Sequence, residues 1–243
     1  MSDIRAERLV KQYGAGDFSV SAVNGMSFTI RSGEFVAVMG ESGAGKSTLL
    51  SIMGGMNSPS EGRYWVDDID VYALHREQRA DFRREFLGFI FQSFHLVPYL
   101  TVLENTLIPL TTVKLPRAVK KEMAMEALSW VGLSDKAHRL PGQISGGECE
   151  RAAIARAIVN EPPILLADEP TGNLDSKTSE EVMSLLRRIH GDGTTIIMVT
   201  HSRSCAAHAQ RILRVSDGRI DENEDAVKCV SQPLQSAVQT VAA

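Results

Sequence analysis

Gly40-Glu41-Ser42-Gly43-Ala44-Gly45-Lys46-Ser47-Thr48 directly follows an apolar segment, Phe35–Met39. A strand, a glycine-rich turn and a helix that opens at a lysine form the pattern of a phosphate-binding loop. Glycines let backbone N–H groups converge on phosphate oxygens, and the helix N-terminus adds its positive end. We expect Lys46 to reach the β- and γ-phosphates and Ser47 to ligate Mg²⁺. The sequence therefore predicts a nucleoside-triphosphate site, because the pattern arises by chance in only about one chain of this size in a hundred.

The bulk composition excludes few functions. The chain has 243 residues, 43% hydrophobic and 23% charged, as in globular proteins with a full core. A net charge of −4 gives no argument for a nucleic-acid partner. Cys149, Cys205 and Cys229 form no CxxC pair, which favours a reducing compartment over a zinc or disulfide framework. Since no apolar run approaches about 18 residues and the first residues lack a signal-peptide core, we expect a cytoplasmic chain that meets the membrane only through a partner.

Residues 4–30 predict a small antiparallel β unit, because apolar and polar side chains alternate there in short segments. Turns are expected at Gly14, Gly16, Asn24-Gly25 and Gly33.

The middle of the chain predicts helices. Residues 74–85 are charged and lack Gly and Pro, which favours one helix. Residues 93–150 read as an all-helical insert, with helices at 103–110 and 118–131 and a stop at Gly132.

After the insert, strands alternate with helices. Apolar strands are expected at 164–167 and 194–199, with an amphipathic helix at 176–190 between them and a shorter strand at 212–215. This alternation predicts a parallel sheet with the phosphate site at its carboxyl edge. Residues 221–243 are acidic, then small and polar, so we expect poor order there.

A second motif supplies carboxylates. The apolar strand at 164–167 runs into Asp168-Glu169-Pro170, which is a Walker B arrangement. Asp168 is then the partner of Mg²⁺, and Glu169 is placed to polarise the attacking water. The alternative is that residues 168–171 only cap the helix that begins near Ser176.

Further motifs resemble those of the ABC-transporter ATPases. Ile144-Ser145-Gly146-Gly147-Glu148 is similar to their LSGGQ signature and lies, as in that family, between the two Walker motifs. The other matches are Gln92 with the Q-loop, Asn173-Leu174-Asp175 with the D-loop, Thr200-His201-Ser202 with the switch histidine, and Tyr13 with the adenine-stacking aromatic residue.

The resemblance implies a fold and a set of site residues. The fold is α/β, a P-loop NTPase with a RecA-like parallel sheet core, an N-terminal antiparallel β subdomain and an all-helical signature subdomain. One ATPase domain spans residues 4–220, with the helical subdomain at about 93–150. The cofactors are ATP and Mg²⁺, the catalytic residues Glu169 and His201, and the metal group Ser47, Gln92 and Asp168. The implied ATP contacts are Tyr13, Gly40, Glu41, Ser42, Gly43, Ala44, Gly45, Lys46, Ser47, Thr48 and Gln92.

The resemblance also implies a homodimer. The signature residues, Ser145, Gly146, Gly147 and Glu148, would face the γ-phosphate held by a second copy, with Asp175 beside them. A phosphate loop and a signature loop of one chain cannot easily meet if the helical insert projects outward, and dimerisation resolves that geometry. Simpler interpretations stay open for the single motifs. Residues 145–147 could be only a loop that enters a helix at 148–159. Gln92 could be a surface amide, Tyr13 a packed side chain and His201 a structural residue.

The sequence departs from the family pattern at four places. Ile144 replaces leucine, and Glu148 stands where glutamine is usual, as in lipoprotein-release relatives. Cys149 and Glu150 replace the common Gln or Arg, and the position of Cys149 near a helix N-terminus predicts a lowered thiol pKa.

The segments 87–98 and 168–175 look like the LolD/MacB/FtsE-type branch of the family. That branch implies a lipoprotein-release or macrolide-export ATPase, peripheral on the inner face of the membrane, that works with a separate FtsX/MacB-type permease. The alternatives are an FtsE-like regulatory ATPase that transports nothing and a soluble ABC ATPase without a transport role.

Overall fold

A computed structural model describes residues 2–14 and 19–221, so Gly16 and the tail predicted to be poorly ordered, 222–243, lie outside the described residues. Within the described part, the central sheet has the strand order β10-β9-β3-β8-β7-β6. Neighbouring strands are parallel except β10, which is antiparallel to β9. The strands are β3 (Phe35–Met39), β6 (Leu87–Ile90), β7 (Ile164–Asp168), β8 (Thr195–Thr200), β9 (Arg211–Ser216) and β10 (Arg219–Ile220).

The central strands are apolar throughout because both faces of the sheet are covered. In β3, Phe35 and Ala37 join the core cluster on one face, whereas Val36 and Val38 join the cluster on the other. The buried parallel strands predicted at 164–167 and 194–199 are confirmed as β7 and β8. Burial on both faces explains why these strands show no alternation in sequence.

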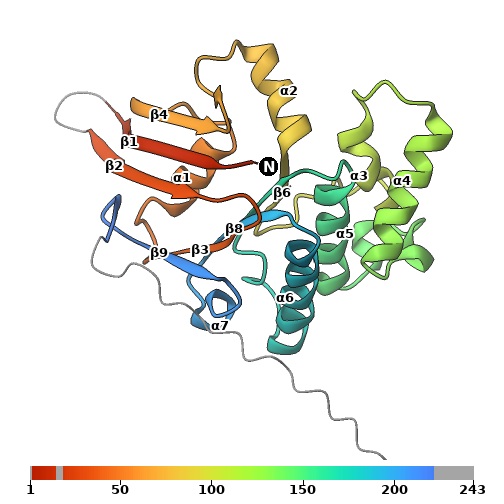
Figure 1. Cartoon of the computed structure of the whole chain (residues 1–243). Helices are drawn as coiled ribbons and strands as arrows, with labels where there is room; N and C mark the ends of the chain where they lie inside the picture. Colours follow the sequence, from red (N-terminus) through yellow and green to blue (C-terminus); the bar gives the residue numbers. More distant parts are fainter. Residues whose placement is uncertain (1, 15–18, 222–243) are drawn as a thin grey trace, which may run out of the picture.

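A second sheet, antiparallel and in the order β2-β1-β4-β5, packs on one side of the core (Figure 1). Its strands are β1 (Ile4–Tyr13), β2 (Val20–Ile30), β4 (Glu61–Val66) and β5 (Ile69–Asp70). The turn predicted at Asn24-Gly25 is wrong, because β2 runs through it. Leu9 pairs with Met26 and Val10 with Asn24, so Gly25, at φ 77°, is the extra residue of a β-bulge.

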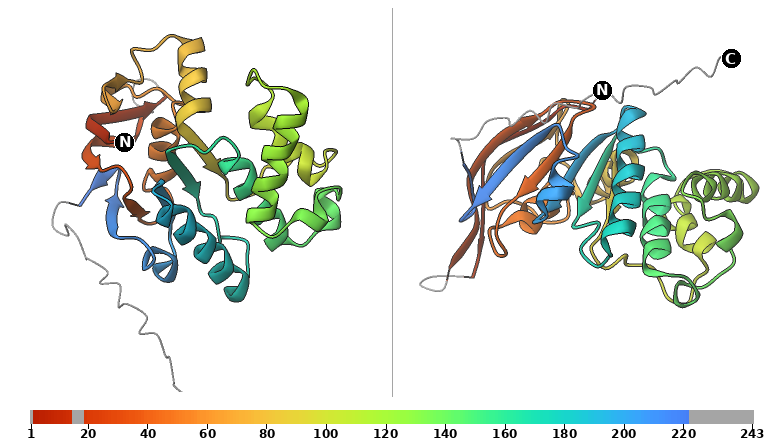
Figure 2. Two further views of the ribbon diagram at one scale, coloured as in Figure 1. Left: turned by 45° about the vertical axis from the view of Figure 1, so that its right-hand side comes forward. Right: turned by 90° about the horizontal axis from the view of Figure 1, so that it is seen from below.

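Helices cover the central sheet and form the far end of the molecule, where α3 and α4 lie opposite the antiparallel sheet (Figure 2). The predicted helix at 103–110 ends early, because Pro109 lies in a separate 3₁₀ turn, Ile108–Leu110. The helix expected from residue 148 begins two residues earlier, at Gly146, and continues past residue 150. The helices are α1 (Lys46–Met53), α2 (Arg76–Phe86), α3 (Val102–Leu107), α4 (Arg117–Trp130), α5 (Gly146–Ile158), α6 (Ser176–Gly191) and α7 (Arg203–Ala206).

This topology places the predicted site at one edge of the central sheet. β3, β7 and β8 are parallel neighbours, so the segments that follow Met39, Asp168 and Thr200 leave the sheet side by side. Over the described residues, no helix is both long and apolar enough to cross a membrane.

Candidate functional site

The loop 40–45 between β3 and α1 depends on its glycines for two different reasons. A Cβ on Gly45 would lie 2.0 Å from the carbonyl oxygen of Ala22, and one on Gly40 would lie 2.1 Å from a carbonyl oxygen of β9. At Gly43, such a Cβ would meet no described residue within 4 Å apart from its chain neighbours, but the φ of 82° is one that side chains disfavour. The loop is thus packed tightly between β2 and β9 at both ends and turned sharply in its middle.

Lys46 lies inside this loop. Its side chain is only 7% exposed, and Nζ donates to the carbonyl oxygens of Gly40 and Glu41 at 2.8 and 2.7 Å. Lys46 is also the first residue of α1, where the backbone N–H groups of a helix lack partners within it. The ammonium group and the helix end therefore place positive charge in one concave loop, as a triphosphate requires.

Ser47 and Asp168 meet across the site. The Ser47 hydroxyl donates to Asp168 Oδ1 at 3.3 Å, although the two residues are 121 positions apart. Burial raises the pKa of Asp168, and the hydrogen bond from Ser47 opposes that shift. A nearby cation favours the charged form of such a carboxylate, and hydroxyl and carboxylate oxygens are ligands that Mg²⁺ prefers. The pair therefore fits the predicted magnesium group.

Glu169 is held between two other predicted site residues. Its Oε1 lies 3.0 Å from His201 Nδ1, and its Oε2 accepts from Gln92 Nε2 at 3.3 Å. The backbone of Glu169 has φ 47°, a conformation that is uncommon without glycine, and its N–H donates to Val199 of β8 at 2.9 Å. This turn directs the chain away from β7 directly after Asp168. The Asp168 carboxylate therefore contacts Ser47, whereas the Glu169 carboxylate contacts Gln92 and His201.

Gln92 joins Glu169 rather than the Ser47–Asp168 pair. Its own carbonyl oxygen accepts from Asn173 Nδ2 at 2.9 Å, which ties the loop after β6 to the segment before α6. Gly172 is close-packed there, since a Cβ on it would lie 3.2 Å from Gln92 Nε2. Gln92 is therefore positioned by the segment 169–173, but no hydrogen bond among the described residues joins it to the other predicted metal ligands, Ser47 and Asp168.

Arg156 of α5 anchors the same loop, and the sequence reasoning missed this function. Its guanidinium donates to the carbonyl oxygens of Phe94 at 2.7 Å and of His95. Both of these residues have positive φ, 60° and 47°. Arg156 thus supports two left-handed residues directly after Gln92, and no local pattern links positions more than 60 residues apart.

Ser145 and Glu148 cap α5 reciprocally. Ser145 Oγ accepts from the Glu148 N–H at 3.3 Å, and Glu148 Oε2 accepts from the Ser145 N–H at 2.8 Å. The hydrogen bond from the Ser145 backbone is the main reason that the pKa of Glu148 is lowered. The spacing Ser-x-x-Glu is a capping-box signal that the sequence analysis overlooked, and it explains glutamate at this departure from the family pattern.

Two expectations near these helix starts are wrong. The pKa of Cys149 is raised, not lowered, because burial outweighs any effect of the helix end and Glu148 and Glu150 add negative charge. Residues 168–171 do not cap α6, since Asp175 does so by accepting from the N–H groups of Lys177 and Thr178 at 3.0 and 3.1 Å. Asp168 and Glu169 are therefore free of that structural task.

The remaining predicted residues lie apart from this cluster. Tyr13 ends β1 with 46% of its surface exposed, and its hydroxyl accepts from Asn57 Nδ2 at 2.5 Å. No hydrogen bond, ion pair or ring contact among the described residues joins Tyr13, or the signature residues 145–148, to the loop 40–48. Gly147 instead packs on α6, where a Cβ would lie 2.3 Å from Thr178 Cγ2.

Comparisons with known proteins identify relatives of this chain. Residues 23–172 match the family model described as ABC transporter. A macrolide export ATP-binding/permease protein, MacB, of Brucella melitensis is 44% identical over 217 residues, which are 89% of this chain and 34% of that protein. An uncharacterized ABC transporter ATP-binding protein of Thermotoga maritima is 43% identical over 87% of this chain and 90% of its own length. The chain thus spans about a third of the MacB relatives that it matches.

Solved structures lead to the same family. A dimeric post-hydrolysis structure of an ATP-binding cassette bound to ADP and phosphate is 39% identical, with a TM-score of 0.84 over 91% of this chain and 98% of that one. The predicted fold class is confirmed, and the resemblance noted from the motifs holds across the chain. The chain belongs to the ABC transporter family and is one of its ATPase cassettes.

Proposed function

We propose that this chain is the ATP-hydrolysing subunit of a lipoprotein-release or macrolide-export type of ABC transporter, and that it drives a separate FtsX/MacB-like permease. The assignment of ATP hydrolysis is supported most directly by the position of the Glu169 carboxylate. It lies between Gln92 and His201 and directly follows Asp168, which pairs with Ser47. One edge of the sheet thus offers a cationic loop, a metal group and an oriented base.

Each group has a distinct task in hydrolysis. Lys46 exchanges the two loop carbonyls that it now contacts for the β- and γ-phosphate oxygens. Ser47 and Asp168 would hold Mg²⁺, which would supply positive charge to neutralise the phosphates. Glu169 accepts the proton of the attacking water, and its existing contacts with Gln92 and His201 fix the direction of the carboxylate.

The signature residues act on a second copy of the chain. The capped N-terminus of α5 at Ser145 is an anion-binding end, yet it has no contact with the loop 40–48 of the same chain among the described residues. The cassettes of two related solved structures are dimers. In the proposed homodimer, each ATP is bound by Lys46 of one copy and by the helix end at Ser145 of the other.

The permease would anchor the chain to the inner face of the membrane. The MacB relatives, of which this chain spans about a third, are described as ATP-binding/permease proteins. A permease of that kind would be the membrane partner of this cassette, and closure and reopening of the cassette dimer would be transmitted to it.

Two variants test the catalytic assignment. Lys46→Ala should lose tight ATP binding, whereas Glu169→Gln should bind ATP as well as the wild type but hydrolyse it about 10²-fold or more slowly. Glu77→Gln, an exposed position on α2, is the matched control and should behave as wild type. Normal turnover by Glu169→Gln would remove Glu169 from the base role, and undiminished ATP affinity of Lys46→Ala would refute the binding site.

A further inference from the structure

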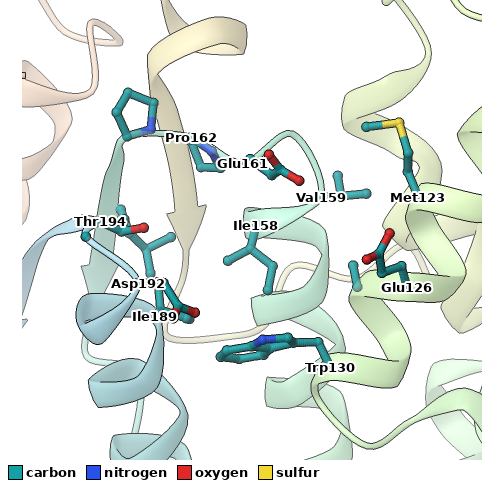
Figure 3. Close-up of a pocket in the computed structure, with 14 residues that line it drawn as sticks. Met123, Glu126, Trp130, Ile158, Val159, Glu161, Pro162, Ile189, Asp192 and Thr194 are labelled. Carbon is teal, nitrogen blue, oxygen red and sulfur yellow. The ribbon is translucent and has the colours of Figure 1, made fainter. Parts of the chain in front are cut away.

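A second cavity lies at the opposite edge of the central sheet from the ATP site. It has a volume of about 500 Å³ and is bounded by α4, the end of α5, the start of β7 and the connection from α6 to β8. Figure 3 shows the Trp130 indole extending from α4 toward Ile189, below Ile158, with Pro162 on the far side. This size and this apolar lining are typical of small-molecule sites.

The charged residues that line this cavity are all acidic. Glu126 comes from α4, Glu161 from the turn after α5, and Asp192 from the turn after α6, and Figure 3 shows their carboxylates on different sides of the space. None of the described lining residues is Lys, Arg or His. Within the described part of the chain, no ion pair or side-chain hydrogen bond engages any of these carboxylates. Three exposed carboxylates, without an ion-pair partner in that part, thus surround an aromatic and aliphatic surface.

Trp130 already attracts a cation. The guanidinium of Arg188, from α6, lies 4.3 Å from the centre of its ring, although Arg188 is not among the residues that line the cavity. The electron-rich face of an indole favours positive charge, and carboxylates around it add to the same field.

We propose that this cavity binds a small amphipathic organic cation. The apolar body of the ligand would lie against Trp130, Ile158 and Pro162, and its positive charge would face Glu126, Glu161 and Asp192. Anionic molecules of the same shape would bind more weakly, because the three carboxylates would repel them.

The cavity is separate from the ATP site but shares its supporting elements. Four elements run from the cavity to a residue of the proposed ATP site of the dimer. These elements are α5, which begins at the Ser145 cap, β7, which ends at Asp168, α6, which is capped by Asp175, and β8, which precedes His201. Along α5, the cavity and the Ser145 end of the helix are about 20 Å apart. Ligand binding here does not require a functioning nucleotide loop.

A pair of probes with nearly the same shape and opposite charge tests the proposal. Isothermal titration calorimetry of the full chain should show saturable one-to-one binding of tetraphenylphosphonium, with tetraphenylborate bound about tenfold or more weakly. Raising the salt concentration should weaken the binding of the phosphonium, since the carboxylates lie at the surface.

Variants then locate the site. The triple variant Glu126→Gln, Glu161→Gln, Asp192→Asn should bind tetraphenylphosphonium about tenfold more weakly than the wild type and lose most of the preference over tetraphenylborate. Each single change should weaken binding about two- to threefold, which keeps the test valid if the triple variant unfolds. Glu122→Gln, exposed on the same helix but outside the cavity, is the matched control and should leave binding unchanged.

Three outcomes would overturn the proposal: no saturable binding of the phosphonium, equal binding of the two probes, or wild-type affinity in both the triple and the single variants. Lys46→Ala should retain phosphonium binding while losing ATP binding. The proposed function and the proposed cation site therefore succeed or fail separately.

Discussion

His201 Nδ1 lies 3.0 Å from Glu169 Oε1, at the carboxyl ends of the adjacent strands β8 and β7. The His201 side chain is 66% exposed and that of Glu169 only 18%. The carboxylate is thus mostly shielded from solvent while its histidine partner is open to it, at the same edge of the sheet as Lys46. We propose that His201 helps to orient Glu169 during hydrolysis.

His201→Ala should slow ATP hydrolysis by about 10²-fold, because Glu169 loses one of the two contacts that direct it. ATP affinity should stay within about twofold of the wild type, since Lys46 and the loop are unchanged. Steady-state turnover and equilibrium nucleotide binding measure the two effects separately. His138→Ala, at an exposed position elsewhere, is the control. Turnover unchanged by His201→Ala would show that the contact with Glu169 has no function in hydrolysis.

The capping box at the start of α5 predicts a difference between two changes at one position. Glu148→Ala should lower the free energy of unfolding by about 1 kcal/mol, because the Ser145 N–H loses its acceptor. Glu148→Gln should retain most of that stability, since an amide oxygen can accept the same hydrogen bond. Urea unfolding of both variants measures the difference. Equal stability of the two variants would mean that the cap contributes nothing measurable.

Glu150 predicts a pH dependence of stability. It is 1% exposed in α5, neither carboxylate oxygen has a hydrogen-bond partner among the described residues, and burial raises its pKa to about 8, partly opposed by Arg156. The folded chain therefore holds this proton more tightly than the unfolded chain. Its contribution to stability is fully present below the unfolded pKa near 4.3 and is lost as the pH rises toward about 8.

The free energy of unfolding should fall by on the order of a few kcal/mol across this pH window in the wild type. Glu150→Gln cannot ionise, so most of the fall should disappear in that variant. Urea unfolding at a series of pH values compares the two chains. A fall of the same size in Glu150→Gln would assign the pH dependence to other groups.

The sequence predicted those parts of the molecule that depend on local pattern. The loop 40–48 and the strand that delivers Asp168 are continuous segments whose chemistry is visible in order, so both were placed correctly. The β-bulge at Gly25 was not foreseen, because glycine at positive φ serves turns and bulges equally. Only the register against β1 distinguishes the two.

Contacts between distant segments that belong to no known motif could not be predicted. The bonds from Arg156 to Phe94 and His95 and the burial of Glu150 arise when α5 packs beside the loop after β6. The acidic cavity combines Glu126 with two turns that follow later helices, and no spacing rule links them. Sequence patterns identify single elements, whereas these features are set by tertiary packing.

The central claim is that one ATP is shared by two copies of the chain, and ATP-dependent association of Glu169→Gln tests it most directly. A second substitution, Gly146→Asp, is combined with Glu169→Gln to disturb the contact that the second copy would make with ATP. Among the described residues, a Cβ there would meet only Leu174, at 3.9 Å, and an acidic residue in the first turn suits a helix N-terminus, so Gly146→Asp should fold normally. Its carboxylate would nevertheless repel a triphosphate presented by a second copy. With ATP and Mg²⁺, light scattering should show Glu169→Gln as a dimer and Glu169→Gln/Gly146→Asp as a monomer that still binds ATP. A monomeric Glu169→Gln saturated with ATP, or a dimer that Gly146→Asp leaves intact, would contradict the account.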